Sequence, residues 1–277
     1  MRFWKSLTAV PMAYCAAFVL GHAALADCTP KHKFSTIEAG TLTIAVTTYA
    51  PYSFLSDGAK ASGVDSDIAT KVAELECLAV KPIAVDPAAA IQYVLSGRAD
   101  IATGDWYRTA ERAKVMNLTA PLYTDQMGLY SKAGVTKVDD LVGKQVGTVQ
   151  GYLWVEDLKK LLGANLRLYP NSVNMQQDLK TGRIEIGVDG YSTGVVAKKA
   201  GSMGDIQVTI AAPDPRVKAT KEAAQAGFPY AKANTAFGEA FDADIQSLHS
   251  DGTIAKILTS YGLDGSAGDT GAARLLQ

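Results

Sequence analysis

The sequence has little of what metal and redox sites are built from. It contains three cysteines and three histidines in 277 residues. One of each lies in the first 26 residues, and the remainder are Cys28, Cys77, His32 and His249. These scattered residues form neither a metal-ligand pattern nor a Cys/His nucleophile pair. We therefore expect no metal ion, no cofactor and no catalytic residues.

An excess of charge of one sign is also missing. The chain has 27 Lys and Arg against 28 Asp and Glu. The first 26 residues hold two of the basic residues and none of the acidic ones, so the rest of the chain is slightly acidic. Nucleic-acid-binding proteins carry basic patches. The charge balance therefore argues against a nucleic acid partner.

Long apolar runs are confined to the N-terminus. Arg2 and Lys5 precede LTAVPMAYCAAFVLGHAALA, which ends in the small-residue triplet Ala24-Leu25-Ala26. This pattern is typical of a secretory signal peptide over residues 1–26 that is cleaved after Ala26. The alternative is a membrane anchor, which the short length and the internal proline and glycine disfavour. We expect an exported, periplasmic protein.

Cys28 and Cys77 would be the two cysteines of the exported chain. In an oxidising compartment such an isolated pair predicts a disulfide. It would tie the N-terminal arm to the amphipathic stretch DSDIATKVAELEC and close a loop of roughly 50 residues. Two free thiols or part of a metal site are the alternatives.

Short apolar runs alternate with amphipathic stretches along the chain. The runs that predict strands are TLTIAVT, AVKPIAV, ADIAT, KQVGTV, LRLYP, RIEIGV and DIQVTIAA. Helical spacing is seen, for example, at Ile68, Val72 and Leu75. Strands that alternate with helices are typical of parallel α/β sheets. We expect a βαβαβ unit to about residue 124, a second to about residue 223, two closing helices, and a frayed Gly-rich tail beyond Leu263.

Six short motifs occur in the order found in one known family. They are Tyr49-Ala50-Pro51-Tyr52, Gly63-Val64-Asp65-Ser66-Asp67-Ile68, Thr109-Ala110-Glu111-Arg112 with Ala120-Pro121-Leu122-Tyr123, Val149-Gln150-Gly151, Gly182-Arg183-Ile184-Glu185 and Asp251-Gly252-Thr253. With these motifs the chain resembles the periplasmic polar-amino-acid-binding proteins of ABC importers, which are extracellular solute-binding proteins of family 3. The resemblance covers essentially the whole exported part.

The resemblance implies a type II periplasmic-binding-protein fold. This fold has two α/β lobes, each a mostly parallel sheet flanked by helices, with the ligand cleft between them. Residues 27–124 and 226–277 would form lobe 1, and residues 125–225 would form lobe 2. The chain would cross between lobes near residues 124–126 and 226–228, and the lobes would close over a ligand by a hinge motion.

The family also implies a function. The chain would be a monomeric extracytoplasmic receptor that captures a small amino-acid-like or cationic zwitterionic ligand and delivers it to the permease of an ABC transporter. Two other classes stay open. Periplasmic cyclohexadienyl dehydratases resemble these binders, and Glu156 or Asp189 would be the acid that such an enzyme needs. A ligand-sensing module for a separate signalling chain is the third class.

The family assigns roles to several positions. Arg112 aligns with the arginine that holds the ligand carboxylate, and a guanidinium suits this role because it can donate two parallel hydrogen bonds. Thr109 would cap the following helix and also contact the carboxylate. Tyr49 falls where an aromatic ring stacks on the ligand side chain. Asp65 and Asp67 are expected to cap the helix that follows them and to fix a turn.

The chain departs from the family at three places. Tyr107 replaces a small hydroxyl residue, and Tyr152-Leu153-Trp154 replaces a pair of Thr or Ser residues that follows a glycine. Gly190 stands where the family has the aspartate that binds the ligand ammonium. Asp105 or Asp189 could replace this acid. Asp189 would reach the cleft only if its strand ended or bulged, because neighbouring strand residues face opposite sides.

Aromatic residues gather at or beside positions that face the cleft in the family. They are Tyr49, Trp106, Tyr107, Tyr152, Trp154 and Tyr191. Ring faces attract methylated or delocalised cations. We therefore expect a zwitterion or amine with a bulky, methylated or aromatic cationic part rather than an ordinary polar amino acid. The rival ligand is an aromatic or apolar amino acid whose ammonium is held by Asp189.

Overall fold

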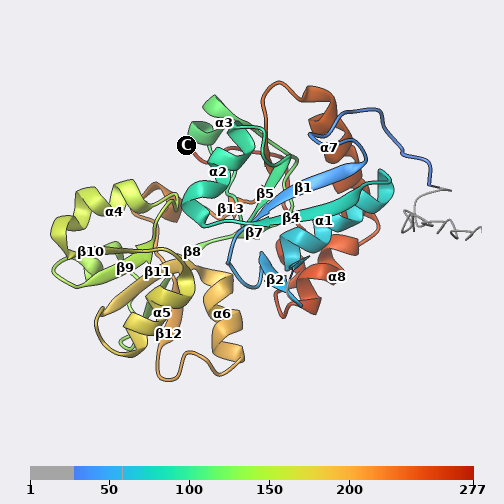
Figure 1. Ribbon diagram of the computed structural model, residues 1–277. Helices are drawn as coiled ribbons and strands as arrows, with labels where there is room; N and C mark the ends of the chain where they lie inside the picture. Colours follow the sequence, from blue (N-terminus) through green and yellow to red (C-terminus); the bar gives the residue numbers. More distant parts are fainter. Residues whose placement is uncertain (1–27, 58) are drawn as a thin grey trace, which may run out of the picture.

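The computed structural model describes residues 28–57 and 59–277, so the expected signal peptide and its cleavage site lie outside the described residues. The described chain forms two lobes, each with a five-stranded sheet and flanking helices (Figure 1). This confirms the expected α/β class and the two-lobed arrangement.

The first sheet has the spatial strand order β4, β1, β5, β14, β6. Its strands are β1 (Thr41–Val46), β4 (Ala79–Ala84), β5 (Ile101–Thr103), β6 (Asn117–Leu118) and β14 (Pro229–Tyr230). β4, β1 and β5 are parallel, whereas β14 is antiparallel to β5 and β6. Because β14 comes from late in the sequence, this lobe is built from both ends of the chain.

The second sheet has the order β10, β9, β11, β8, β12. Its strands are β8 (Met127–Ser131), β9 (Val146–Val149), β10 (Leu166–Tyr169), β11 (Ile186–Gly190) and β12 (Gln207–Ile210). β10, β9 and β11 are parallel, and β8 runs antiparallel to both β11 and β12. The strand β8 has no counterpart among the runs that the sequence predicted as strands.

Two short strands connect the lobes. β7 (Thr124–Asp125) and β13 (Ala224–Gln225) pair as an antiparallel ribbon. Their positions agree with the crossings expected near residues 124–126 and 226–228 to within two residues. A separate hairpin is formed by β2 (Phe54–Ser56) and β3 (Lys60–Ser62). The limits of the lobes as domains remain a prediction.

The helices cover the faces of the two sheets. They are α1 (Val64–Leu75), α2 (Pro87–Leu95), α3 (Ala110–Val115), α4 (Val155–Leu162), α5 (Ser172–Lys180), α6 (Tyr191–Lys199), α7 (Thr235–Ser250) and α8 (Thr253–Ser260), with 3-10 turns at Val138–Leu141, Gly163–Asn165, Lys218–Thr220 and Gly265–Gly268. None of the described helices is both long enough and apolar enough to cross a membrane. Figure 1 shows α7 and α8 beside α1 at the outer side of the first lobe.

Alternating residues of β1 divide the first lobe into two cores. Leu42 and Ile44 pack into a cluster with residues of α1, α7 and α8, including Ile68 and Phe241. Ala45 faces the other way and packs in a cluster with α2. The period of two in the strand and the helical spacing of Ile68 and Val72 therefore have the packing roles that the sequence indicates.

The Gly-rich tail is ordered, so the expectation of a frayed end is wrong. Leu276 is buried, its N–H donates to the Arg108 carbonyl at 2.9 Å, and its carbonyl accepts from the Ala110 N–H at 3.0 Å. The Gln225 side chain donates to the carbonyls of Thr270 and Ala272. The Gly-rich composition predicts a disordered end. The burial of Leu276 and the hydrogen bonds to its backbone and to the carbonyls of Thr270 and Ala272 hold the segment in place instead.

The expected disulfide is present between Cys28 and Cys77, with their Cα atoms 5.7 Å apart. It joins the N-terminal arm to the end of α1 across a sequence separation of 49 residues.

Replacement of both cysteines by serine should lower the free energy of unfolding by roughly 4 kcal/mol, because the loop of about 50 residues is no longer closed in the unfolded chain. Chemical denaturation of the variant and of unreduced wild-type protein would measure the difference. Thiol labelling of unfolded, unreduced wild-type protein should find no free thiol. Equal denaturation midpoints for the two proteins would contradict this role.

Candidate ligand-binding site

The turn after β5 is held by a buried carboxylate. Asp65 Oδ2 accepts the backbone N–H groups of Gly104 and Asp105 at 2.8 Å each, and Asp65 Oδ1 accepts the Tyr123 hydroxyl. Burial raises the pKa of Asp65, and these three hydrogen bonds oppose that rise. Asp65 therefore orients the start of the segment that continues to Arg112.

The expected capping role of Asp65 and Asp67 is wrong. The residue before α1 is Gly63, and no side chain caps the helix. Asp67 accepts a hydrogen bond from the Tyr261 hydroxyl at 2.8 Å. Both carboxylates make long-range contacts instead, which the local sequence pattern does not reveal.

A cavity lies between the two lobes. It is lined by Thr47, Tyr49, Pro87, Gly104, Asp105, Trp106, Tyr107, Arg112, Tyr152, Leu153 and Trp154. Its empty space is about 400 Å³, including the part open to solvent. The residues from Thr47 to Arg112 come from the first lobe, and the residues from Tyr152 to Trp154 follow β9 in the second.

Arg112 is the cationic residue of the cavity lining. Thr109 caps α3 by accepting the Arg112 N–H at 3.1 Å, which places the guanidinium at the start of that helix. Arg112 Nη1 donates to the Tyr107 carbonyl at 2.7 Å, and the guanidinium carbon lies 4.8 Å from the centre of the Trp106 ring. Burial lowers the pKa of Arg112 to about 10, so the group stays charged at neutral pH. Its remaining N–H groups can bind an anion.

Aromatic rings from both lobes meet at the cavity. The rings of Tyr152 and Trp154 pack edge to face with their centroids 5.4 Å apart, and the ring centroids of Tyr49 and Tyr152 are 5.5 Å apart. The ring centroids of Tyr107 and Trp154 are 6.3 Å apart. The Trp154 Nε1–H donates to Thr148 Oγ1 at 2.7 Å, which fixes the indole. Since rings of the first lobe touch rings of the second, the cavity has a wall that both lobes complete.

Three buried aspartates surround this wall, and each has a carboxylate oxygen without a hydrogen-bond partner in the described structure. These oxygens are Asp105 Oδ1, Asp125 Oδ2 and Asp189 Oδ2. Burial, and then the charge of Asp125, hold the pKa of Asp105 well above its usual range. Burial also raises the pKa of Asp125, and that of Asp189 to about 7. Burial therefore favours the neutral form of these acids, and a cation bound beside them would favour their charged form instead.

Gly190 has no room for a side chain. A Cβ atom at this position would lie far inside van der Waals contact of the Tyr49 hydroxyl and 2.8 Å from Asp125 Oδ2. Asp125 is held there by the Ser192 N–H and hydroxyl, which donate to Oδ1 at 3.2 and 2.7 Å. The space next to the family's aspartate position is therefore taken by an acid from the connecting ribbon.

Seven of the ten expected binding residues line the cavity, namely Tyr49, Asp105, Trp106, Tyr107, Arg112, Tyr152 and Trp154. The other three do not. Thr109 is a buried helix cap, and Tyr191 begins α6 with its N–H bonded to the Gln126 carbonyl. β11 has neither ended nor bulged at Asp189, which pairs with Gly128 of β8 and is fully buried. Direct ligand contacts remain predictions for all ten residues.

Sequence reasoning missed Asp125 and Thr47. Asp125 lay in the expected crossing, where it could be taken for a polar connecting residue. Only the pairing of β7 with β13 brings it beside Gly190. Thr47 directly follows β1 and lines the cavity, but it belongs to no motif that marked it in the sequence.

In the part of the chain that the structure describes, one group of side chains has metal-ligand spacing. It consists of His32, Glu76 and Asp244. None of these residues lines the cavity between the lobes.

Comparison with known proteins agrees with this architecture. Residues 42–264 match the family described as bacterial extracellular solute-binding proteins, family 3. The L-cystine-binding protein TcyJ of Escherichia coli strain K12 is 29% identical over 157 residues. The alignment covers 53% of this chain and 58% of TcyJ, so less than two thirds of that relative's length is matched.

Solved structures share the fold. An ABC uptake transporter substrate-binding protein from Streptococcus pneumoniae with bound histidine has a TM-score of 0.72 at 20% identity, covering 81% of this chain and 94% of that chain. The amino acid ABC transporter substrate-binding protein AbpA of the same organism, bound to L-arginine, has a TM-score of 0.71 at 24% identity, with 83% and 96% covered.

Gly190→Ala should weaken the binding of the tightest ligand at least roughly tenfold while both lobes stay folded, because the new methyl group collides with Tyr49 of the other lobe. Calorimetry measures the affinity, and circular dichroism checks the fold. Adding Tyr49→Phe removes the hydroxyl, so the double variant should bind better than the sum of the two single effects predicts. Unchanged affinity in Gly190→Ala would contradict this packing constraint.

Asp189 should make the ligand-free protein less stable as the pH rises. Its folded pKa of about 7 lies above the usual value of 3.8, so its contribution is complete below pH 4 and is lost as the pH rises towards 7. Relative to Asp189→Asn, the wild-type protein should lose about 1–3 kcal/mol of unfolding free energy between pH 5 and pH 8. Urea denaturation at both pH values measures this, and parallel pH profiles would rule it out.

Proposed function

Because the chain belongs to the bacterial extracellular solute-binding proteins of family 3, we propose that it captures a small zwitterionic or cationic ligand between its lobes and delivers it to an ABC permease. One observation carries the proposal. An aromatic-lined cavity between the lobes has Arg112 in its wall and buried carboxylates with unpaired oxygens around it. In this proposal the protein is exported by an N-terminal signal peptide and works as a monomer in the periplasm.

The Arg112 end of the cavity suits a carboxylate or a similar anion. The guanidinium is oriented by its contacts with the Tyr107 carbonyl and the Trp106 ring, which leave N–H groups for a ligand. Such an oriented fork loses little side-chain freedom when it binds a planar anion. This supports the role that the family assigns to an arginine at this position.

The acidic part of the site suits a cation. Asp105 lines the cavity, and Asp125 reinforces it from the connecting ribbon, so an ammonium has an alternative to the missing family aspartate. A bound cation would compensate the burial of these carboxylates. The proposed ligand therefore carries one anionic end, one cationic end, and an apolar or delocalised part against the rings.

The aromatic wall favours either a methylated or delocalised cation, or the side chain of an aromatic or apolar amino acid. TcyJ is named for binding L-cystine, and the two solved structures of the same fold contain bound histidine and bound L-arginine. Tyr49 and Tyr107 of the first lobe lie next to Tyr152 and Trp154 of the second, and in this proposal the wall forms around the ligand when the lobes close. We place the hinge at the ribbon of β7 and β13.

We propose a binding protein without catalytic activity. Glu156, one acid considered for an enzyme on this fold, is exposed and pairs with Lys159 at 2.7 Å. Asp189, the other, does not line the cavity. Incubation of the purified protein with prephenate or arogenate should give no product, and turnover at a rate that falls in Asp189→Asn would support an enzyme instead.

The ligand class is tested by thermal shift with betaines, methylated amines, guanidino compounds and the standard amino acids. We expect strong stabilisation by compounds that carry both a carboxylate and a cationic group. Mass spectrometry of small molecules released from freshly purified protein gives an independent identification. Stabilisation by simple anions or neutral sugars alone would contradict the proposed charge pattern.

Arg112→Ala should weaken ligand binding by about 2–5 kcal/mol, the usual loss when one partner of a buried charge pair is removed. Arg98→Ala is the matched control, because Arg98 also lies over an aromatic ring, that of Tyr93 at 4.0 Å, but outside the cavity lining. Calorimetry should show near-normal affinity for the control. Equal losses of affinity in the two variants would show that Arg112 does not contact the ligand.

A further inference from the structure

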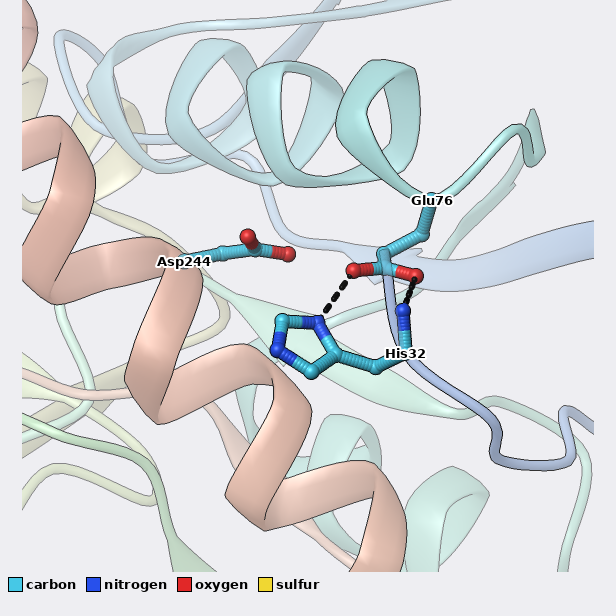
Figure 2. Close-up of side chains that lie close together, drawn as sticks. All are labelled: His32, Glu76 and Asp244. Atoms are coloured by element: carbon cyan, nitrogen blue, oxygen red, sulfur yellow. Dashed lines mark hydrogen bonds and ion pairs between the residues drawn. The ribbon is translucent and has the colours of Figure 1, made fainter. Parts of the chain in front are cut away.

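A second cluster of chemically competent side chains lies in the first lobe, away from the cavity. His32 belongs to the N-terminal arm, Glu76 follows the last residue of α1, and Asp244 lies in the middle of α7. One ligand atom from each residue lies within 4.8 Å of the others. Figure 2 shows the three side chains pointing toward one another from these three segments.

The cluster is buried on its acidic side and open on its imidazole side. The side chains of Glu76 and Asp244 are 0% and 2% exposed, whereas that of His32 is 36% exposed. The His32 Nδ1 lies 2.6 Å from Glu76 Oε1, and the His32 backbone N–H donates to Glu76 Oε2 at 3.0 Å. Both carboxylate oxygens of Glu76 thus contact His32 of the N-terminal arm.

Asp244 is not satisfied in the same way. Its Oδ2 is buried and has no hydrogen-bond partner among the described residues. Its Oδ1 forms a loose ion pair with Lys31 Nζ at 3.7 Å. A buried carboxylate oxygen without a partner is costly, and this one belongs to a side chain that points at an imidazole and a second carboxylate (Figure 2).

The cluster can be reached from solvent. His32 and Glu76 line a surface cavity with Pro30, Phe34, Cys77 and Leu78 among its walls, and the empty space there is about 770 Å³, including the part open to solvent. Asp244 does not line this cavity, so an ion would reach the cluster from the exposed side of His32, where water could complete its coordination.

We propose that His32, Glu76 and Asp244 bind one divalent transition-metal ion, for which Zn²⁺ is the test probe. One imidazole nitrogen with two carboxylates is a donor set of this class, whereas Mg²⁺ and Ca²⁺ prefer oxygen ligands alone. The ion would take the place of the close contact between His32 Nδ1 and Glu76 Oε1 and would give Asp244 Oδ2 a partner. This site is independent of the ligand cavity and was not expected from the sequence.

The ion would have a structural effect. It would join the N-terminal arm to α1 and α7, beside the disulfide that already joins the arm to the end of α1. Binding to the folded chain alone stabilises it in proportion to the logarithm of the metal concentration. The ion would thus fix the arm at a second point, on α7.

The experiment uses exported, disulfide-bonded protein without a histidine tag, stripped with a chelator that is then removed. Titration calorimetry with Zn²⁺ should give one site per chain, and thermal denaturation should show a rise in melting temperature with Zn²⁺. Asp244→Asn and His32→Ala should each weaken Zn²⁺ binding by roughly tenfold or more. Mg²⁺ and Ca²⁺ should bind more weakly than Zn²⁺.

Two further variants sharpen the test. His249→Ala is the control, because His249 contacts the Pro121 carbonyl and lies outside the cluster, so Zn²⁺ binding should stay unchanged. Lys31→Gln removes the competing cation beside Asp244 and should tighten Zn²⁺ binding, an effect that a site elsewhere on the surface would not give. Circular dichroism checks that each variant is folded.

Absence of Zn²⁺ binding to the stripped wild-type protein would overturn the proposal. Binding that persists at full affinity in folded Asp244→Asn would overturn it as well, because the ion would then lie elsewhere. Neither result affects the proposed ligand cavity, whose residues are not changed in these variants.

Discussion

The geometry of the cavity depends on one buried carboxylate. Asp65 accepts hydrogen bonds from the backbone of Gly104 and Asp105 and from the Tyr123 hydroxyl. It thereby joins the first turn of α1 to the segment that carries the cavity residues and to the residue just before the connecting ribbon. Without this acceptor the two N–H groups would be buried unpaired, and the turn that presents Asp105 and Trp106 would lose its support.

The second constraint is the close approach of the lobes at Gly190. Because glycine has no Cβ atom, the Gly190 N–H can donate to the Tyr49 hydroxyl at 3.2 Å, and Asp125 can occupy the adjacent space. The glycine therefore allows the two lobes to approach closely, and it also changes which acid lies at this position. It removes one acid from the family's usual place and lets another, from the ribbon between the lobes, lie next to the cavity.

The third feature is a group of acidic side chains buried around the cavity. Burial raises the pKa of both Asp105 and Asp125, the charge of Asp125 raises the pKa of Asp105 further, and Arg112 is the one cationic residue of the cavity lining. Such an arrangement is costly for the isolated chain and becomes favourable when a cation enters. The same logic applies on a smaller scale to Asp244 in the first lobe.

The α/β class, the alternation of strands and helices and the disulfide could be predicted from local periodicity and from the two remaining cysteines, and most of the cavity lining could be predicted from the family resemblance. The roles of Asp125, Asp65 and Leu276 became clear in the folded structure. Each of these contacts residues far away in the chain, and an isolated aspartate or leucine carries no mark of its distant partner. The strand β8 was missed for a related reason, since its glycine, tyrosine and serine are buried by neighbouring strands and helices rather than by a pattern of their own. Helices and strands could therefore be predicted from local sequence patterns, whereas the hydrogen-bond partners of buried polar groups depend on the whole fold.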